Sequence, residues 1–211
     1  ICSDEQLSAR SVIIATGASP KRLNIPGENK FMAKGVSYCA ICDAPLFKGK
    51  TVAVIGGGNA AVEEAIFLSR FVKKLYLIHR RDSLRATAIL QEQLKAISNC
   101  QIIFSSIPFR ILGEGRVSAL ELKSVLDNKI TKISCEGVFI FIGQVPNTDF
   151  VKSIVKLDEF GYIIADSRMR TREEGIFACG DCIAKNLRQV ITAASDGAQA
   201  AYSLINYLSQ P

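Results

Sequence analysis

Two cysteines separated by two residues, Cys39 and Cys42, could form a reversible disulfide. In a C-x-x-C unit the two sulfur atoms can meet, so the pair can cycle between dithiol and disulfide. A glycine-rich segment, Gly56 to Ala61, follows a short way along the chain. Glycines between a strand and a helix can hold the phosphates of a nicotinamide cofactor, which donates hydride. The two motifs together indicate redox chemistry, with an electron source and an electron acceptor on one segment.

The glycine-rich segment has the context that a nucleotide-binding turn requires. Strands are expected at Val52 to Ile55, before it, and at Leu75 to Ile78, after it. Between the two strands, apolar residues recur at the spacing of a helix, at Ala61, Ala65, Leu68 and Val72. An ordinary glycine-rich loop is the alternative interpretation. The residues expected to bind the cofactor here are Gly56, Gly58, Asn59, Ala60, Ala61 and Glu63.

A cluster of basic residues follows the second of these strands. His79, Arg80 and Arg81 come directly after it, and Arg85 lies about one helical turn further on. An NAD site usually has an acidic residue at this position, about 20 residues beyond the glycines, to bind the ribose 2′-hydroxyl. Arginines can instead bind a 2′-phosphate through charge-assisted hydrogen bonds. The sequence therefore predicts that NADPH is preferred over NADH, and the alternative is a solvated basic patch.

The first cysteine pair has two other interpretations, half of a zinc site or two packed core thiols. A structural zinc site would need a further pair of cysteines or histidines at suitable spacing, and His79 is the only histidine. A second C-x-x-C unit exists, Cys179 and Cys182, but it follows a predicted buried strand, and we expect it to pack in the core. No metal site is therefore expected. The cysteines without a partner by spacing are Cys2, Cys100 and Cys135.

Asp43 directly follows Cys42 and is the candidate acid/base. A dithiol that exchanges with another redox group needs a proton carrier. His79 is already assigned to the cofactor ribose, which leaves Asp43 for this role. Capping of a turn or helix is the alternative.

The order of the predicted elements indicates an α/β protein with two domains. Residues 20–143 are expected to form a Rossmann-like nucleotide-binding domain, inserted between two pieces of another domain, residues 1–19 and 144–211. Within the insert we expect a helix near residues 89–97, a strand at 102–104, a hairpin at 117–134 and a buried strand at 138–142. Outside it we expect a buried strand at 12–15 and a final helix at 190–208.

The composition argues against several other classes of protein. No apolar run in the 211 residues approaches the roughly 18 residues that would span a bilayer. The net charge is +6, but basic and acidic residues are interleaved, so a nucleic-acid partner is not expected. Seven cysteines, an odd number, argue against a secreted disulfide framework and indicate a reducing compartment, the cytoplasm.

In combination the motifs resemble those of the low-molecular-weight, bacterial-type thioredoxin reductases. The NADPH domain of that family carries C-A-x-C-D, then G-G-G-N-x-A, then H-R-R-D, and this chain has Cys39 to Asp43, Gly56 to Ala61 and His79 to Asp82. Residues 12–18 are similar to the family's I-I-A-T-G-A, and residues 141–146 to its A-I-G-x-x-P. The resemblance therefore covers essentially the whole chain.

The resemblance implies a flavoprotein with two dinucleotide-binding domains. Electrons would pass from NADPH to FAD, then to the disulfide of Cys39 and Cys42, and then to thioredoxin. Residues 20–143 would be the NADPH-binding domain, and residues 1–19 and 144–211 would be part of the FAD-binding domain. The match implies that Asp181 meets the ribityl chain of FAD. The resemblance also implies that further residues bind the cofactors, namely Thr16, Gly17, Ile142, Gly143, Gly180, Arg188, Gln189 and Val190.

Three further expectations follow from the resemblance. The full-length family protein is a homodimer, and its NADPH domain rotates about linkers that correspond here to residues 16–21 and 143–147. The family's own glycine-rich turn for the FAD pyrophosphate has no counterpart before Val12, so this chain is expected to bind NADPH but to carry little FAD. The alternatives are an NADPH-binding fragment without flavin chemistry and a ferredoxin-type NADP reductase, which has no use for a C-x-x-C unit.

Overall fold

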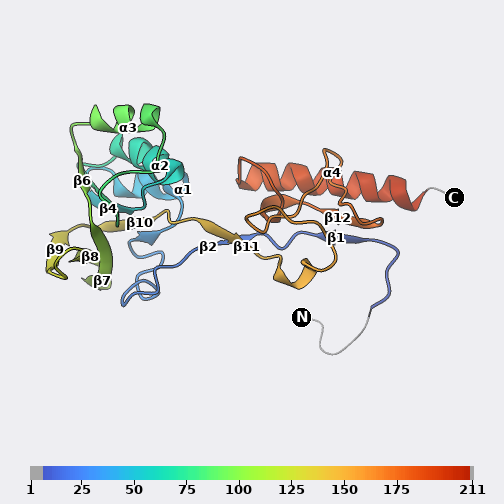
Figure 1. Cartoon of the computed structure of the whole chain (residues 1–211), viewed down its shortest axis with the longest axis horizontal. Coiled ribbons are helices and arrows are strands. Elements are labelled where there is room, and N and C mark those ends of the chain that lie inside the picture. Colours follow the sequence, from blue (N-terminus) through green and yellow to red (C-terminus); the bar gives the residue numbers. More distant parts are fainter. Residues whose placement is uncertain (1–6, 210–211) are drawn as a thin grey trace. The chain divides into compact units, whose positions relative to one another are not determined.

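The computed structural model describes residues 7–209 and divides the chain into two compact units. One unit comprises residues 20–143, and the other comprises the segments before and after it, up to residue 19 and from residue 144. Helices and parallel strands alternate over residues 36–103, as Figure 1 shows, and the predicted α/β class is confirmed. Among the described helices, none combines the length and the apolar character needed to cross a bilayer.

A parallel sheet of five strands forms the centre of the unit 20–143. In spatial order the strands are β3 (Val36–Ser37), β10 (Gly137–Ile140), β4 (Thr51–Ile55), β5 (Lys74–Ile78) and β6 (Cys100–Ile103). The helix α2 (Asn59–Ser69) connects β4 to β5, and α3 (Ala88–Lys95) connects β5 to β6. The strand–helix–strand unit expected around the glycine-rich segment is therefore confirmed.

The two faces of this sheet are covered by different layers. Val52 and Val54 of β4 pack in a core with α2, whereas Ala53 and Ile55 pack in a second core with the strands that follow β6. Those strands form a three-stranded antiparallel sheet of β7 (Ser106–Glu114), β8 (Arg116–Ser124) and β9 (Ile130–Ser134). Figure 1 shows α2 and α3 on one side of the parallel sheet and β7 to β9 on the other. Because both faces are buried, β4 is apolar along most of its length.

The sequence predicted β8 and β9 as a hairpin, which is confirmed, but it did not predict β7. Pro108 and Gly113 interrupt the alternation of apolar and polar residues that marks a strand, and the register of β7 against β8 shifts at both places. Two short helices, α1 (Ala40–Asp43) and η1 (Ala44–Phe47), connect β3 to β4 and were also not predicted.

The other unit contains a two-stranded parallel sheet of β1 (Val12–Ile14) and β12 (Ile176–Ala178). A second two-stranded sheet pairs β2 (Ala18–Pro20) with β11 (Gln144–Pro146) at the predicted linkers. Two single helical turns, η2 (Asp149–Val151) and η3 (Gly180–Cys182), precede the long helix α4 (Val190–Leu208), whose bounds agree with the prediction. The core of this unit comprises Ile14, Val151, Val155, Ile163, Ala178, Cys182 and Ile183.

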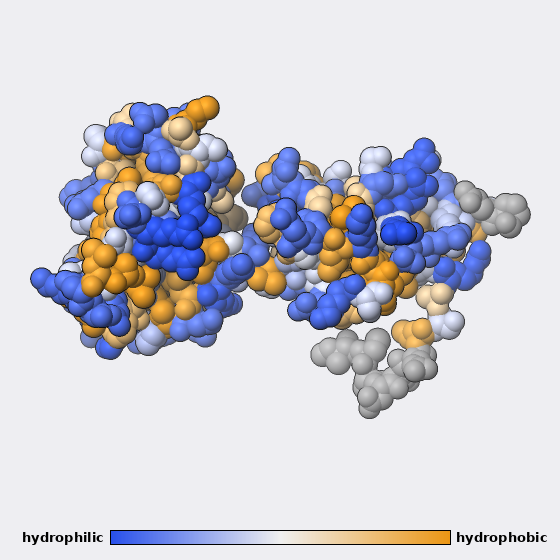
Figure 2. Space-filling model, in the orientation of Figure 1, coloured by the Kyte–Doolittle hydropathy of each residue, from blue (hydrophilic) through white to orange (hydrophobic). Residues whose placement is uncertain are grey.

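The same unit also exposes large apolar side chains. Figure 2 shows hydrophobic areas between hydrophilic ones on the face of this unit that is in view. Four exposed apolar side chains belong to α4, namely Val190, Ile191, Tyr202 and Ile205. The helix α4 therefore leaves part of its apolar surface exposed.

Candidate functional site

The two cysteines of the first C-x-x-C unit are joined. Cys39 and Cys42 form a disulfide with their Cα atoms 5.4 Å apart, so the predicted pairing is confirmed. Cys39 is the N-cap residue of α1, and its sulfur accepts a hydrogen bond from the amide of Cys42 at 3.2 Å. Cys42 is exposed and Cys39 is half-buried. The short helix therefore presents one sulfur of the pair to solvent.

Asp43 lies at the end of the same helix, and a serine holds its carboxylate. The hydroxyl of Ser37 donates a hydrogen bond of 2.6 Å to Asp43 Oδ2 and accepts one of 3.1 Å from the amide of Cys39. Asp43 makes no side-chain capping bond at the start of η1, so the capping alternative is not supported. Ser37 is buried and was not identified from the sequence, because a lone serine beside a cysteine has no distinctive pattern.

The glycine-rich turn permits close approaches that larger residues would block. Gly56 has φ +152°, and a methyl group placed on it would lie 2.5 Å from the carbonyl oxygen of Phe141. The imidazole of His79 packs against Gly57, where a methyl group would lie 2.2 Å from its Nδ1. Sequence reasoning assigned no role to Gly57, the middle glycine. A side chain at this position would collide with His79, which is 22 positions further along the sequence. Only folding brings this histidine to the turn.

The predicted basic residues gather beside this turn. Arg80, Arg81 and Arg85 are exposed, and their charges, together with burial, lower the pKa of His79 from its ordinary value. Burial has the largest effect, and Arg85 contributes the most of the three. Arg85 Nη2 lies 4.0 Å from the position of a methyl group on Gly58. Arg85 and His79 therefore lie beside the turn, and Arg80 and Arg81 lie close enough to His79 to act on its pKa.

These residues fit a dinucleotide with a 2′-phosphate. The helix α2 has no side-chain cap at Gly58, so the amides of its first turn are available to phosphate oxygens. His79 Nε2 is buried and has no hydrogen-bond partner among residues 7–209. A ligand hydroxyl would give this nitrogen a partner, and exposed arginines beside it suit a phosphate.

A second acidic residue on α2, Glu64, was missed by the sequence analysis, which chose its exposed neighbour Glu63. Glu64 Oε2 is buried without a hydrogen-bond partner in the described chain. Burial, and to a lesser extent the charge of Glu63, raises the pKa of the Glu64 carboxyl. A half-buried carboxyl with a raised pKa, on the helix that begins at the predicted cofactor site, is a candidate functional residue.

In the other unit, Thr16 and Gly17 bind Asn147. The hydroxyl of Thr16 donates to the carbonyl oxygen of Asn147 at 2.7 Å, and the side-chain amide of Asn147 donates to the carbonyl oxygen of Thr16 at 2.9 Å. The amide of Asn147 also donates to the carbonyl oxygen of Gly17. Ile142 and Gly143, which precede β11, are exposed. The predicted hinge residues are therefore held by a defined set of hydrogen bonds.

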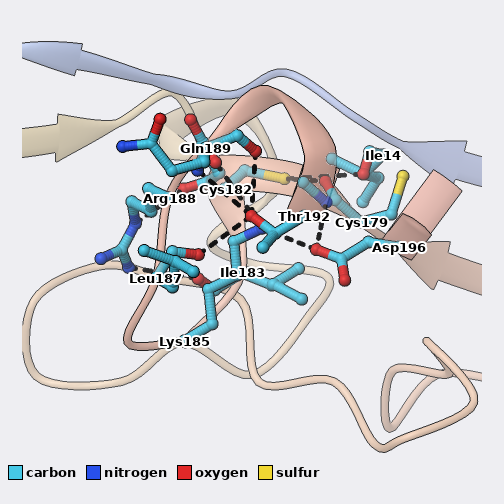
Figure 3. A network of polar contacts seen from close by, with 12 residues as sticks. Ile14, Cys179, Cys182, Ile183, Lys185, Leu187, Arg188, Gln189, Thr192 and Asp196 are labelled. Atoms are coloured by element: carbon cyan, nitrogen blue, oxygen red, sulfur yellow. Dashed lines mark hydrogen bonds and ion pairs between the residues drawn. The ribbon is translucent and has the colours of Figure 1, made fainter. Parts of the chain in front are cut away.

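The segment from Gly180 to Val190 forms a polar network that Figure 3 shows from close by. Arg188 donates from Nε to the carbonyl oxygen of Asp181 and from Nη2 to that of Ile183, and its guanidinium lies 3.9 Å from the centre of the Tyr162 ring. Gln189 caps α4 through a reciprocal pair of hydrogen bonds with Thr192. The predicted residues Gly180, Asp181, Arg188 and Gln189 are therefore brought together.

An ion pair links the middle of this segment to the helix α4. Lys185 Nζ lies 2.7 Å from Asp196 Oδ2 and 3.6 Å from Asp181 Oδ1, and both members of the close pair are largely buried. Asp196 also accepts a hydrogen bond from the amide of Gly180. Asp181 Oδ1 is buried and lacks a hydrogen-bond donor within residues 7–209. A ligand hydroxyl, such as one of a ribityl chain, would fit this unsatisfied oxygen.

The second C-x-x-C unit is not joined. Cys179 and Cys182 are buried free thiols, and the sulfur of Cys182 donates to the carbonyl oxygens of Ile14 and Cys179. Figure 3 shows the two sulfur atoms directed apart. This arrangement fits the expected packing role. In residues 7–209 no three cysteine, histidine or acidic side chains are grouped so that they could hold a metal ion, and Cys2 lies outside the described residues.

The chain matches the family of pyridine nucleotide-disulphide oxidoreductases over residues 2–197, and it belongs to this family. It is 46% identical over 201 residues to thioredoxin reductase of Treponema pallidum (strain Nichols), with 95% of this chain and 65% of that protein covered. It is 42% identical over 209 residues to thioredoxin reductase of Peptoclostridium acidaminophilum, with 96% of this chain and 66% of that protein covered. An alkyl hydroperoxide reductase protein of Escherichia coli (strain K12) is 41% identical over 203 residues, with 96% of this chain and 39% of that protein covered.

The solved thioredoxin reductase from Streptococcus pyogenes MGAS5005 superposes with a TM-score of 0.91 at 43% identity, covering 99% of this chain and 68% of that one. This likeness confirms the predicted flavoprotein fold with two dinucleotide-binding domains and the resemblance to thioredoxin reductases. The chain spans about two thirds of the length of these thioredoxin reductases.

Proposed function

We propose that this chain carries the NADPH-binding and disulfide parts of an NADPH-dependent flavin disulfide oxidoreductase of the thioredoxin reductase type. The observation that carries the proposal is the Cys39–Cys42 disulfide in the same compact unit as a glycine turn against which His79 packs, with three arginines acting on that histidine. This unit, residues 20–143, is proposed as the NADPH-binding domain. The other unit is proposed as part of an FAD-binding domain.

NADPH binding is supported by the geometry of the turn. The amides at the start of α2 and the glycines before them suit the pyrophosphate, and Arg80, Arg81 and Arg85 suit the 2′-phosphate. The proposed FAD contacts in the other unit are Asp181, whose buried oxygen lacks a donor, and the segment 188–190. FAD supplies the transfer of electrons between a hydride donor and a disulfide.

Residues of this chain carry out the thiol–disulfide exchange with the substrate. Two electrons and two protons convert the Cys39–Cys42 disulfide to two thiols. A thiolate of this pair then attacks one sulfur of the substrate disulfide, which forms a mixed disulfide and releases the other substrate sulfur as a thiolate. The second thiolate of the pair attacks the mixed disulfide, re-forms the Cys39–Cys42 bond and releases the remaining substrate sulfur as a thiolate. Asp43 beside Cys42 is proposed to hold or move the proton, and Ser37 fixes its carboxylate at 2.6 Å.

The proposed electron acceptor is thioredoxin, and the proposed compartment is the cytoplasm, where thiols stay reduced. The thioredoxin reductases among the relatives support thioredoxin as the acceptor. Similarity to an alkyl hydroperoxide reductase protein makes another disulfide protein the competing acceptor. A homodimer is proposed from the resemblance, and light scattering of the purified protein tests it.

The test measures NADPH oxidation by the purified protein with added FAD and thioredoxin. Turnover should be slow, because this chain is expected to carry little FAD, but each NADPH consumed should reduce one thioredoxin disulfide. Cys39→Ser and Cys42→Ser should each abolish this reduction and leave NADPH binding intact. Cys100→Ser, which removes a half-buried free thiol, is the matched control and should behave as the unaltered protein. NADPH binding without a flavin spectrum or disulfide reduction would instead identify an NADPH-binding protein without flavin chemistry.

A further inference from the structure

Two loops of the unit 20–143 would each bind a different phosphate of the cofactor. At the proposed site the turn Gly56 to Gly58, after β4, would face the pyrophosphate, and the basic loop, residues 79–87 after β5, would face the 2′-phosphate. The covalent structure of the nucleotide fixes the separation of these two phosphates. Recognition of NADPH therefore requires that the two loops keep a fixed separation as well.

Two hydrogen bonds join the basic loop to the region of the turn. The amide of Arg85 donates to the carbonyl oxygen of Gly57 at 2.7 Å. The amide of Thr87 donates to Asn59 Oδ1 at 2.9 Å. The first bond uses only backbone atoms. The second depends on a side chain, and it links the first residue of α2 to the N-cap residue of α3.

Other contacts fix the basic loop to neighbouring elements rather than to the turn. Gln91 of α3 donates from its side chain to the carbonyl oxygen of Ala86 at 2.8 Å, and the amide of Ser105 donates to the carbonyl oxygen of Arg81 at 3.0 Å. Ala86 is buried in the core beneath α2, and Leu84 packs against the same core. Loss of the Asn59 bond should therefore leave the loop folded but less firmly placed against the turn.

We propose that Asn59 is a positioning residue for the choice of NADPH over NADH. Its carboxamide oxygen, bonded to Thr87, holds the basic loop and its arginines at the distance from the glycine turn that the 2′-phosphate requires. This inference rests on the proposed NADPH site. It differs from the role expected from the sequence, in which Asn59 binds the cofactor directly.

The experiment measures dissociation constants for NADPH and NADH with the full chain. Asn59→Ala should weaken NADPH binding about tenfold, the effect of losing one hydrogen bond, and change NADH binding less than about twofold. Thr87→Pro removes the donor from the other end and suits the φ of −58° at this position, so it should reproduce the loss. Combining the two substitutions should cause no further loss, because both remove the same bond.

Two matched variants separate the bond from other effects. Thr87→Ala keeps the amide, and the Thr87 side chain makes no capping bond to α3, so NADPH affinity should stay within about twofold of the unaltered chain. Asn59→Asp keeps an acceptor for Thr87, so its ratio of NADPH to NADH affinity should stay close to that of the unaltered chain. This variant provides the second measurement if Thr87→Pro fails to fold.

Two results would overturn the inference, and they are distinguishable. Equal weakening of NADPH and NADH by Asn59→Ala, with no effect of Thr87→Pro, would show that Asn59 binds the cofactor directly. An unaltered chain that binds NADPH no more tightly than NADH would instead refute the proposed 2′-phosphate site, and the positioning role with it.

Discussion

Replacing Tyr38 by phenylalanine should destabilise the unit 20–143 by removing one donor from a buried carboxylate. Glu28 is 2% exposed and accepts three hydrogen bonds, from the amides of Leu23 and Asn24 at 3.0 and 2.6 Å and from the Tyr38 hydroxyl at 2.6 Å. These bonds tie the segment before β3 to the residue that precedes Cys39. The Tyr38→Phe variant keeps the ring and deletes only the hydroxyl.

The expected size of the effect follows from the pKa of Tyr38. Burial, and then the hydrogen bond and charge of Glu28, raise this pKa from 10.0 to about 12. The difference corresponds to about 2.7 kcal/mol. Its largest cause is burial, which the phenylalanine ring retains, and the half-buried side chain is partly screened by water, so the hydrogen bond to Glu28 accounts for only part of the difference. We therefore expect the variant to lose about 1–2 kcal/mol of unfolding free energy at pH 8.

The difference between the two proteins should depend on pH with a defined sign. The pKa of Tyr38 is higher in the folded chain than in the unfolded chain. Its contribution is therefore fully present below pH 10 and is lost as the pH rises towards about 12. Comparison with the phenylalanine variant cancels other groups that titrate in this range, because both proteins contain them.

Urea denaturation followed by circular dichroism at pH 8 and pH 11 measures this difference. The gap in unfolding free energy should be smaller at pH 11. Tyr76→Phe is the matched control, since the Tyr76 ring faces Lys74 instead of a buried carboxylate, and its stability should be unchanged. Equal stability of Tyr38→Phe and the unaltered chain at pH 8, or a gap that does not shrink with pH, would refute the reasoning.

Three further outcomes are expected. Arg80→Ala combined with Arg81→Ala should weaken NADPH binding about a hundredfold, because two exposed charge-assisted bonds are lost. NADH binding, measured by titration, should show almost no change, and equal loss for both cofactors would contradict the proposed 2′-phosphate site. Gly57→Ala should lower the melting temperature, because its methyl group would meet the imidazole of His79, and Gly57→Ala with His79→Ala should recover part of the loss. Brief alkylation of the reduced chain at pH 8, followed by mass mapping, should modify Cys39 and Cys42 before the thiols whose pKa is raised by burial. Early modification of those buried thiols would argue against Cys39 and Cys42 as the reactive pair. Those thiols are Cys100 with a pKa of about 11, Cys135 with a pKa of about 12, and Cys179.

The sequence by itself determined the elements whose signals are local. The β-branched run of β4, the glycines after it and the helical spacing of α2 lie within about one βαβ unit, so periodicity and turn chemistry are sufficient to predict them. The final helix α4 was predicted with the bounds that the structure shows, Val190–Leu208. The Cys39–Cys42 pairing could be predicted because a two-residue spacer lets the sulfurs meet, whereas Cys179 and Cys182, which have the same spacing, follow a buried strand and stay free.

The tertiary structure decided how residues of different loops contact one another. The bond from Ser37 to Asp43, the bond from Thr87 to Asn59 and the packing of His79 on Gly57 each depend on the path of a loop. Such contacts leave no period in the sequence, because each joins single side chains or amides across irregular segments. For the same reason β7 was missed, since its partner β8 compensates for the interruptions at its proline and glycine. Residue types therefore specified which chemistry is available, and folding specified which groups hold the reactive ones in place.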